Sequence, residues 1–234
     1  MVRHELLNTL LRLFPAPRYL EIGVQTAETF RFIKAAERVA VDPMLQFDRE
    51  SPDFMQSPSV FFEIPSDQYF EKHADVSRPF DVVFIDGLHT FEQTFRDFTN
   101  VLGCTSRSSI IVLDDIAPGD FVEAAHMDTY LKIRQFYPEN TGWMGDVFKM
   151  LFMIETFFPS IQMRVPAEAR NQLITWRTPF ARPIANSVMK SVAGVAGAQF
   201  ADLVLSRPHF TPRPLAQIVQ EYSTQLEQTG GGDR

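Results

Sequence analysis

The stretch Arg18-Tyr-Leu-Glu-Ile-Gly-Val24 decides the fold that the sequence predicts. It is short, apolar and ends at a glycine, which is typical of a buried strand that leads into a turn. Residues 25–36 then look helical, and Arg38-Val-Ala-Val-Asp-Pro43 predicts a second buried strand. Such an alternation of strand and helix indicates parallel β-α-β units.

Three more strands are predicted in the same alternation with helices, at residues 60–64, 80–86 and 109–115. This fivefold alternation predicts a doubly wound, mostly parallel sheet with helices on both faces, which is a Rossmann-like α/β fold. Residues 160–165 and 172–177 are candidates for a closing antiparallel pair, so we expect about seven strands.

The rest of the chain is predicted to be helical or irregular. Apolar residues at helical spacing indicate an opening helix that stops before Pro15, and a later helix over Gly145–Phe158. Prolines after Thr178 separate two helical stretches. We therefore expect residues 1–178 to form the Rossmann-like domain and residues 179–234 to form a helical C-terminal extension packed on the same domain.

The composition argues against two classes of partner. The formal net charge is −7 and the pI is near 5.3, whereas nucleic-acid phosphates require a dense Lys/Arg face. Cys104 is the only cysteine, so an intrachain disulfide cannot form and a reducing compartment fits. The first residues lack signal-peptide features, and no run approaches the roughly 20 apolar residues of a membrane span. We expect a soluble, cytoplasmic protein with neither nucleic acid nor a membrane as partner.

Acidic residues gather where the predicted strands end. Open α/β sheets bind their ligands at the carboxyl ends of the strands. Four of the five predicted strands deliver an acid to that edge, and this convergence is the strongest internal evidence for a site. The residues concerned are Glu21 with Gly23, Asp42, Asp86, and Asp114 with Asp115.

Gly23 and Asp42 each allow two interpretations. A glycine after a buried strand lets the backbone approach a ligand closely, but a plain tight turn explains it equally well. An acid at the end of the second strand can bind both hydroxyls of a ribose, but it can also cap the turn before Pro43. Together they favour an adenosyl ligand without a pyrophosphate, because the G-x-G-x-x-G pattern is missing.

Four segments resemble successive motifs of the class I S-adenosylmethionine (SAM)-dependent methyltransferases, most closely a bacterial branch that tailors sugars and natural products. They are Tyr19-Leu-Glu-Ile-Gly-Val24, Val41-Asp-Pro43, Phe80-Asp-Val-Val-Phe-Ile-Asp-Gly-Leu-His-Thr90 and Ile111-Val-Leu-Asp-Asp115. Gly-Asp-Val-Phe-Lys149 after a tryptophan also resembles a segment of that branch. The resemblance covers roughly residues 17–158.

The resemblance implies a SAM site at the strand ends. Its expected members are Glu21 and Gly23 at the methionine end, Asp42 at the ribose, Ser66 or Asp67 near the adenine, and Asp86 at the end of the fourth strand. The sequence departs from the family pattern twice. Ala27 stands where a second glycine is usual, and Arg107-Ser-Ser109 replaces a Gly-Gly pair before the fifth strand.

Asp86, Asp114 and Asp115 form a candidate metal site. Neighbouring carboxylates repel one another unless a cation or a proton compensates their charge. Oxygen ligands favour a hard ion such as Mg²⁺, which could lower the pKa of an acceptor hydroxyl. The alternative is that Asp114 or Asp115 caps the following turn while Asp86 bonds only to backbone.

His89 follows Asp86 at the mouth of the fourth strand and is the candidate general base. An unperturbed imidazole pKa near 6.5 suits removal of a proton from an acceptor hydroxyl. The alternative is a structural role at the start of the helix near Thr90. Trp143 and Met144 are candidates for an acceptor pocket or for core packing.

The leading hypothesis is a methyltransferase that uses SAM, with possible Mg²⁺ assistance, to methylate a hydroxyl of a small molecule such as a sugar or secondary metabolite. A second hypothesis is a non-catalytic methyltransferase-like binding or scaffold protein, suggested by the two departures. A nucleotide-dependent enzyme of another Rossmann family is a third.

The Ala/Val/Gly run from Ser191 to Phe200 permits close packing in a homodimer, in a lid or, by default, in an ordinary packing helix.

Overall fold

The computed structural model describes residues 1–55, 57–139, 142–181 and 187–228. The chain divides into two compact units. Unit 1 comprises Met1–Leu88 and Arg96–Val112, and unit 2 comprises His89–Phe95 and Leu113–Arg234.

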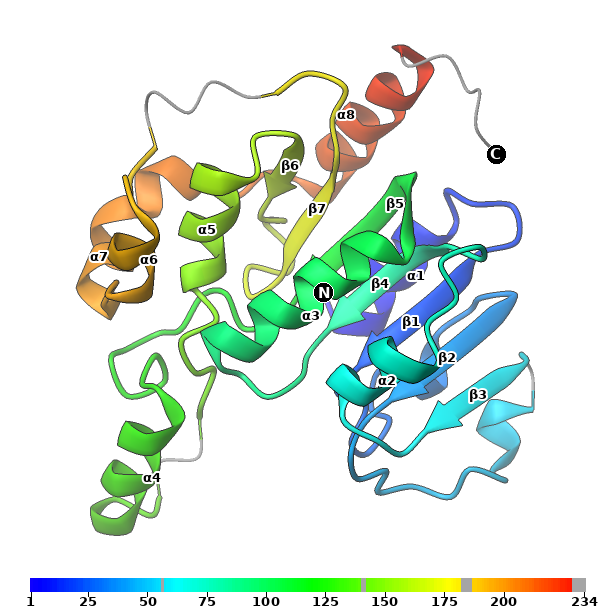
Figure 1. Cartoon of the computed structure of the whole chain (residues 1–234), viewed down its shortest axis with the longest axis horizontal. Helices are drawn as coiled ribbons and strands as arrows, with labels where there is room; N and C mark the ends of the chain where they lie inside the picture. The colour runs from blue at the N-terminus through cyan, green and yellow to red at the C-terminus, as the bar shows by residue number, and fades with distance from the viewer. Residues whose placement is uncertain (56, 140–141, 182–186, 229–234) are drawn as a thin grey trace. The chain divides into compact units, whose positions relative to one another are not determined.

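The strands form one seven-stranded sheet in the order β3-β2-β1-β4-β5-β7-β6 (Figure 1). In unit 1, β1 pairs in parallel with β2 and β4, and β2 pairs in parallel with β3. In unit 2, β6 and β7 are antiparallel. The Rossmann-like α/β prediction is confirmed. The bounds are β1 Arg18–Ile22, β2 Glu37–Val41, β3 Ser59–Phe62, β4 Phe80–Ile85, β5 Thr105–Leu113, β6 Ile161–Arg164 and β7 Leu173–Arg177.

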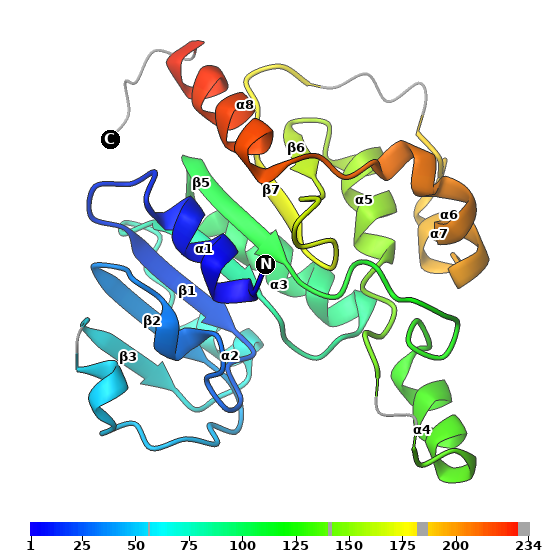
Figure 2. The ribbon, with the colours of Figure 1, turned by 180° about the vertical axis from the view of Figure 1, so that it is seen from behind.

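The core of unit 1 lies on the central strands. Leu20 of β1 is opposite Val39 of β2 and Val83 of β4, and all three are buried. Strands that are buried on both faces are apolar throughout rather than alternating, which explains the continuous apolar runs in the sequence. Helix α1 (Arg3–Leu11) crosses one face of β1 and β4 (Figure 2), and α2 (Ser66–Lys72) lies on the opposite face (Figure 1).

The predicted helix over residues 25–36 is wrong. Only a short 3₁₀ helix, η1 (Phe30–Phe32), is present there. Gln25 and Ala27 have φ values of 41° and 58°, in the left-handed region that is incompatible with a right-handed helix. The side chain of Asn8 on α1 donates to the carbonyl of Phe32 at 2.8 Å, so a contact distant in sequence satisfies part of the non-helical backbone.

The side chain of Arg38 on β2 stabilises this irregular segment through hydrogen bonds. Its side chain is fully buried and donates to the carbonyl groups of Phe30, Ile33, Phe54 and Ser57. Buried carbonyl groups need partners, and a guanidinium offers five N–H donors. One buried arginine therefore replaces part of the hydrogen bonding that a regular helix would have provided. Phe54 belongs to a second 3₁₀ helix, η2 (Pro52–Phe54).

Two of the helix predictions for unit 2 need correction. Helix α4 (Met127–Phe136) forms in the segment before Gly145, where no helix was predicted, and Tyr130 is its buried residue. Helix α5 (Lys149–Phe157) begins four residues after Gly145, because Gly145 has a φ of 63° and lies outside helical geometry. The predicted antiparallel pair of β6 and β7 is confirmed.

The C-terminal part of unit 2 is helical, as predicted, but in shorter pieces. These are α6 (Val192–Ala196), α7 (Phe200–Ser206), the 3₁₀ helix η3 (Arg207–Phe210) and α8 (Leu215–Gln228). The first predicted stretch spans about residues 184–205, and its residues 184–186 lie outside the described residues. Val195 of α6 is fully buried, as in an ordinary packing helix. Glu221 of α8 accepts hydrogen bonds from Gln162 and Arg164 of β6. The boundary at residue 178 and the homodimer stay predictions.

None of the described helices combines the length and the apolar character that crossing a membrane would require.

Candidate functional site

The strand order reverses between β1 and β4, and Gly23 lies at this switch point. In open α/β sheets the crevice at the switch point is where ligands bind. Gly23 has a φ of 86°, and a Cβ on it would lie 1.8 Å from the carbonyl oxygen of Asp86. The glycine is therefore required to let the segment after β4 approach the segment after β1, in addition to any role toward a ligand.

Asp42 fixes the loop after β1 to the end of β2. Its Oδ2 accepts a hydrogen bond from the backbone N–H of Gln25 at 2.9 Å, and its Oδ1 accepts one from Met44 at 2.7 Å. The turn-capping interpretation is therefore observed. Each carboxylate oxygen has two lone pairs, so these bonds leave acceptor capacity for a ribose, and that role stays a prediction.

Glu21 is buried in β1, with an exposed fraction of only 2%. The hydroxyl of Tyr19 donates to its Oε2 at 2.5 Å. Burial raises the pKa of Glu21 from 4.5 to about 8, with a further contribution from the negative charge of Asp86. The carboxyl group is therefore mostly protonated at neutral pH in this state of the protein.

We expect Glu21→Gln to stabilise the protein at pH 8 by on the order of 4 kcal/mol. The folded pKa is raised, so the folded state binds more protons than the unfolded state. Stability of the native protein is then lost as the pH rises from about 4.5 toward 8, and the amide variant should lack this loss. Urea unfolding between pH 5 and 8 measures it.

Glu37→Gln is the matched control, because the hydrogen bond from Arg18 lowers the pKa of Glu37. Glu37→Gln should destabilise the protein at neutral pH, so its change in the free energy of unfolding has the opposite sign to that of Glu21→Gln. Parallel pH profiles for native protein and Glu21→Gln would contradict the assignment.

Ser66 and Asp67 lie at the start of α2, after β3. Pro65 occupies the N-cap of this helix, and Ser66 is its first helical residue. Asp67 is exposed and lies 3.5 Å from Arg96 Nε. Their proposed position near an adenine stays a prediction.

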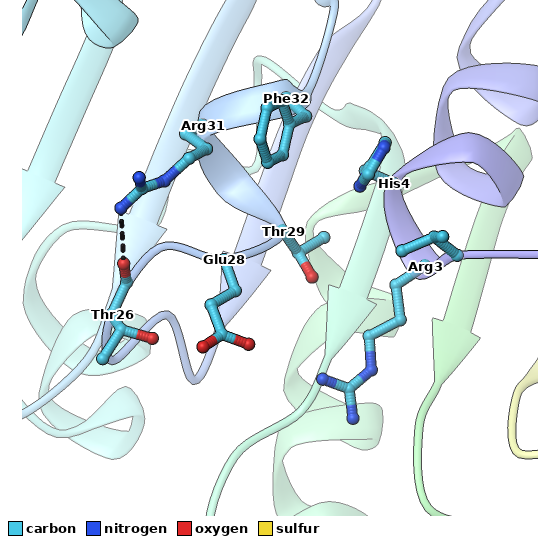
Figure 3. Close-up of a pocket in the computed structure, with 8 residues that line it drawn as sticks. Arg3, His4, Thr26, Glu28, Thr29, Arg31 and Phe32 are labelled. Carbon is cyan, nitrogen blue, oxygen red and sulfur yellow. Dashed lines mark hydrogen bonds between the residues drawn. The ribbon is translucent and has the colours of Figure 1, made fainter.

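A pocket of about 450 Å³ opens beside the switch point, between the start of α1 and the segment after β1 (Figure 3). Arg3 links the pocket to the end of β4, because its Nη1 lies 3.6 Å from Asp86 Oδ2. The pocket is lined by Val2, Arg3, His4, Thr26, Glu28, Thr29, Arg31 and Phe32.

The polar groups of the pocket carry both signs of charge. In Figure 3 the side chains of Arg3 and Glu28 extend in the same direction, with Thr29 between them. Arg31 is held by hydrogen bonds to the carbonyl groups of Thr26 and Ala27 at 3.0 and 3.1 Å. A guanidinium binds carboxylates, and a carboxylate binds ammonium groups. The pocket therefore suits a ligand that carries both.

Sequence reasoning missed this pocket. Arg3 and His4 were part of the opening helix, and residues 26–32 were assigned to a regular helix that is absent. The available signal was the segment Glu21-Ile-Gly23, but the side chains that line the pocket come from positions without a motif.

His89 and Asp115 form a pair within unit 2. His89 Nε2 lies 3.1 Å from Asp115 Oδ2. Their φ values are 39° and 61°, which is unusual for residues other than glycine. Strained backbone of this kind is concentrated at functional sites. A carboxylate beside one imidazole nitrogen fixes the orientation and tautomer of the ring, as a general base requires.

Asp114 and Asp115 have different partners although they are adjacent. Asp114 Oδ1 accepts hydrogen bonds from Gln172 Nε2 at 2.6 Å and from the N–H of Asp115 at 2.9 Å. Asp115 instead pairs with His89. The predicted metal ligands Asp86, Asp114 and Asp115 stay a prediction.

The contacts of Asp146 show the structural role of the Gly-Asp-Val-Phe-Lys149 segment. Its Oδ1 accepts from the N–H of Phe91, the first residue of α3 (Phe91–Gly103), at 2.7 Å. Its Oδ2 lies 2.8 Å from Lys149 Nζ. A Cβ on Gly145 would lie 1.6 Å from the carbonyl oxygen of His89, so only glycine permits this approach. The segment thus holds the backbone around His89.

The strand order β3-β2-β1-β4-β5-β7-β6 is that of a Rossmann-like α/β sheet, and a charged pocket lies at its switch point. Residues 20–116 match the family model described as a methyltransferase domain. This match confirms the resemblance to methyltransferases that was drawn from the sequence. No curated protein sequence matches the chain.

Several solved structures align with about three quarters of the chain at low sequence identity. The O-methyltransferase TomG from Streptomyces achromogenes, solved with SAM, has 17% identity and a TM-score of 0.48 over 75% of this chain and 79% of that chain. Rv0187 from MTB, solved with cofactor, has 15% identity and a TM-score of 0.49 over 74% and 78%. An O-methyltransferase from Bacillus cereus, solved with SAH, has 16% identity and a TM-score of 0.43 over 74% and 79%.

Proposed function

We propose that this protein transfers a methyl group from SAM to a hydroxyl group of a small molecule, such as a sugar or a secondary metabolite. The observation that carries the proposal is the charged pocket at the switch point of a methyltransferase domain. Its geometry suits the amino-acid end of SAM, which carries a carboxylate and an ammonium group.

Each part of the donor has a candidate partner. Arg3 would bind the carboxylate of SAM, and Glu28 would bind its ammonium group, because they extend to the same side of the pocket. Asp42 would bind the ribose through its remaining lone pairs. The donor site would also include the backbone around Glu21 and Gly23, with Ser66 or Asp67 near the adenine and Asp86 beside Arg3.

His89 would act as the general base. The hydroxyl oxygen of the acceptor forms a bond to the methyl carbon while the bond from that carbon to sulfur breaks, which leaves S-adenosylhomocysteine (SAH) as product. The hydroxyl proton passes to the imidazole, and Asp115 stabilises the resulting imidazolium through its contact at 3.1 Å. Alignment of acceptor and donor supplies the remaining acceleration.

A Mg²⁺ ion is a secondary part of the proposal. Asp86, Asp114 and Asp115 supply hard carboxylate oxygens, which fit this ion chemically. Such an ion would lower the pKa of an acceptor hydroxyl when bound.

Calorimetry with SAH tests the donor site. We expect binding in the micromolar range, and Arg3→Gln should weaken it about 10- to 150-fold, because one charge-assisted hydrogen bond contributes roughly 1.5–3 kcal/mol. Arg12→Gln is the matched control, since Arg12 is an exposed arginine at the other end of α1. Asp42→Ala should abolish binding. Equal affinity in Arg3→Gln and native protein would remove Arg3 from the site.

A non-catalytic binding protein is the second candidate function. Ala27 is buried and has a φ of 58°, where glycine would be unstrained, so its methyl group stands in the loop that would face the donor. This alternative predicts SAH binding without turnover, or no binding with or without Mg²⁺.

A further inference from the structure

We propose that Trp143 is a positioning residue that holds the imidazole of His89 in the orientation needed for proton transfer, and that α4 supports Trp143 in this role. The inference rests on the proposed function, because it assigns a role to a neighbour of the proposed base.

Trp143 and Gly145 contact His89 through its side chain and its backbone. The indole of Trp143 lies 5.5 Å from the imidazole, centroid to centroid, at an interplanar angle of 41°. Gly145 approaches the carbonyl oxygen of His89 so closely that it tolerates no Cβ. The imidazole is therefore held by Asp115 at Nε2 and by an aromatic ring. A planar side chain with two such neighbours has little rotational freedom.

Trp143 is itself fixed from two directions. Its Nε1 donates to the carbonyl of Ala125 at 2.8 Å. Its ring stacks on Tyr130 with centroids 5.3 Å apart and an interplanar angle of 15°. Tyr130 is the buried residue of α4, so the stack joins Trp143 to this helix. The N–H and the ring of Trp143 both make contacts within unit 2, which favours a supporting role over direct recognition of an acceptor.

The consequence concerns rate rather than donor binding. A base contributes only when its nitrogen lies within hydrogen-bond reach of the proton that it removes. Loss of the indole would let the imidazole adopt other rotamers, and a displacement of about 1 Å can lower turnover about 100-fold. The donor pocket belongs to unit 1 and contains none of these residues.

NMR of labelled histidine side chains tests the placement without an acceptor. The ring current of Trp143 should displace the Hε1 resonance of His89, so Trp143→Leu should move it, and Tyr130→Leu should move it less. Trp176→Leu is the matched control: Trp176 also packs against a tyrosine and donates its N–H within unit 2, to Gln225. That variant should leave the His89 resonance in place. An unmoved resonance in Trp143→Leu would overturn the proposal.

Kinetics test the functional part, with radiolabelled SAM and a panel of sugar and phenol acceptors. Trp143→Leu should lower kcat about 10- to 100-fold with an unchanged KM for SAM, and Trp143→Phe should restore most of it. A change confined to the KM for the acceptor, or an unchanged kcat, would contradict a positioning role. If the native protein transfers no methyl group, the proposed function fails while the NMR result still decides whether Trp143 holds His89.

Discussion

His89→Ala should lower kcat for methyl transfer by about 10²- to 10⁴-fold, the usual contribution of a general base. The affinity for SAH should stay within about twofold, because His89 belongs to unit 2 and does not line the donor pocket. Steady-state kinetics and calorimetry on the same preparations separate the two quantities. Retention of full turnover would show that His89 is not the base.

Two further variants distinguish loss of the base from a folding defect. His89 has a φ of 39°, and asparagine tolerates this left-handed region better than most residues. His89→Asn therefore preserves the backbone while it removes the base, and it should lose as much turnover as His89→Ala. His209→Ala changes an exposed histidine of η3 and should leave turnover unchanged. Equal losses in all three variants would indicate a general effect on folding.

Gly23→Ala should prevent unit 1 from folding or destabilise it by more than about 3 kcal/mol. The added Cβ would lie 1.8 Å from the carbonyl oxygen of Asp86, and the φ of 86° is unfavourable for alanine. The obstacle is backbone in the neighbouring loop, so a change of side-chain rotamer cannot relieve it. Urea unfolding followed by circular dichroism measures the loss, and donor binding should disappear with the fold.

Gly103→Ala is the matched control for that substitution. Gly103 lies at the end of α3 in unit 1, and a Cβ there meets nothing within 4 Å. Alanine should be neutral or stabilise the helix by about 0.5–1 kcal/mol. If Gly23→Ala unfolded at the same urea concentration as Gly103→Ala, the close approach of the β1 and β4 loops would not exist in solution.

Ala27 illustrates how sequence and structure combine. The sequence shows only that alanine replaces a usual glycine. The structure adds that the residue has a φ of 58° and is fully buried. Ala27 therefore adopts a backbone conformation that favours glycine. A left-handed alanine costs about 1 kcal/mol, which the contacts of the loop must offset.

The sequence by itself determined the strands, the α/β class and the acids at the strand ends. These features depend on local hydrophobic periodicity and on turn residues, which a linear pattern records. Sequence resemblance also identified the methyltransferase domain, because its motifs are continuous segments.

Only the tertiary structure decided three other features. The irregular segment after β1 depends on a hydrogen bond from Asn8, which is distant in sequence, and on the guanidinium of Arg38, which the fold buries beneath the segment. The pocket arises because α1 and the segment after β1 contribute Arg3 and Glu28 to the same lining. The division of the adjacent acids Asp114 and Asp115 between Gln172 and His89 depends on which side chains the fold places beside each. Long-range contacts carry no local signal, so these features appear only when the chain has folded.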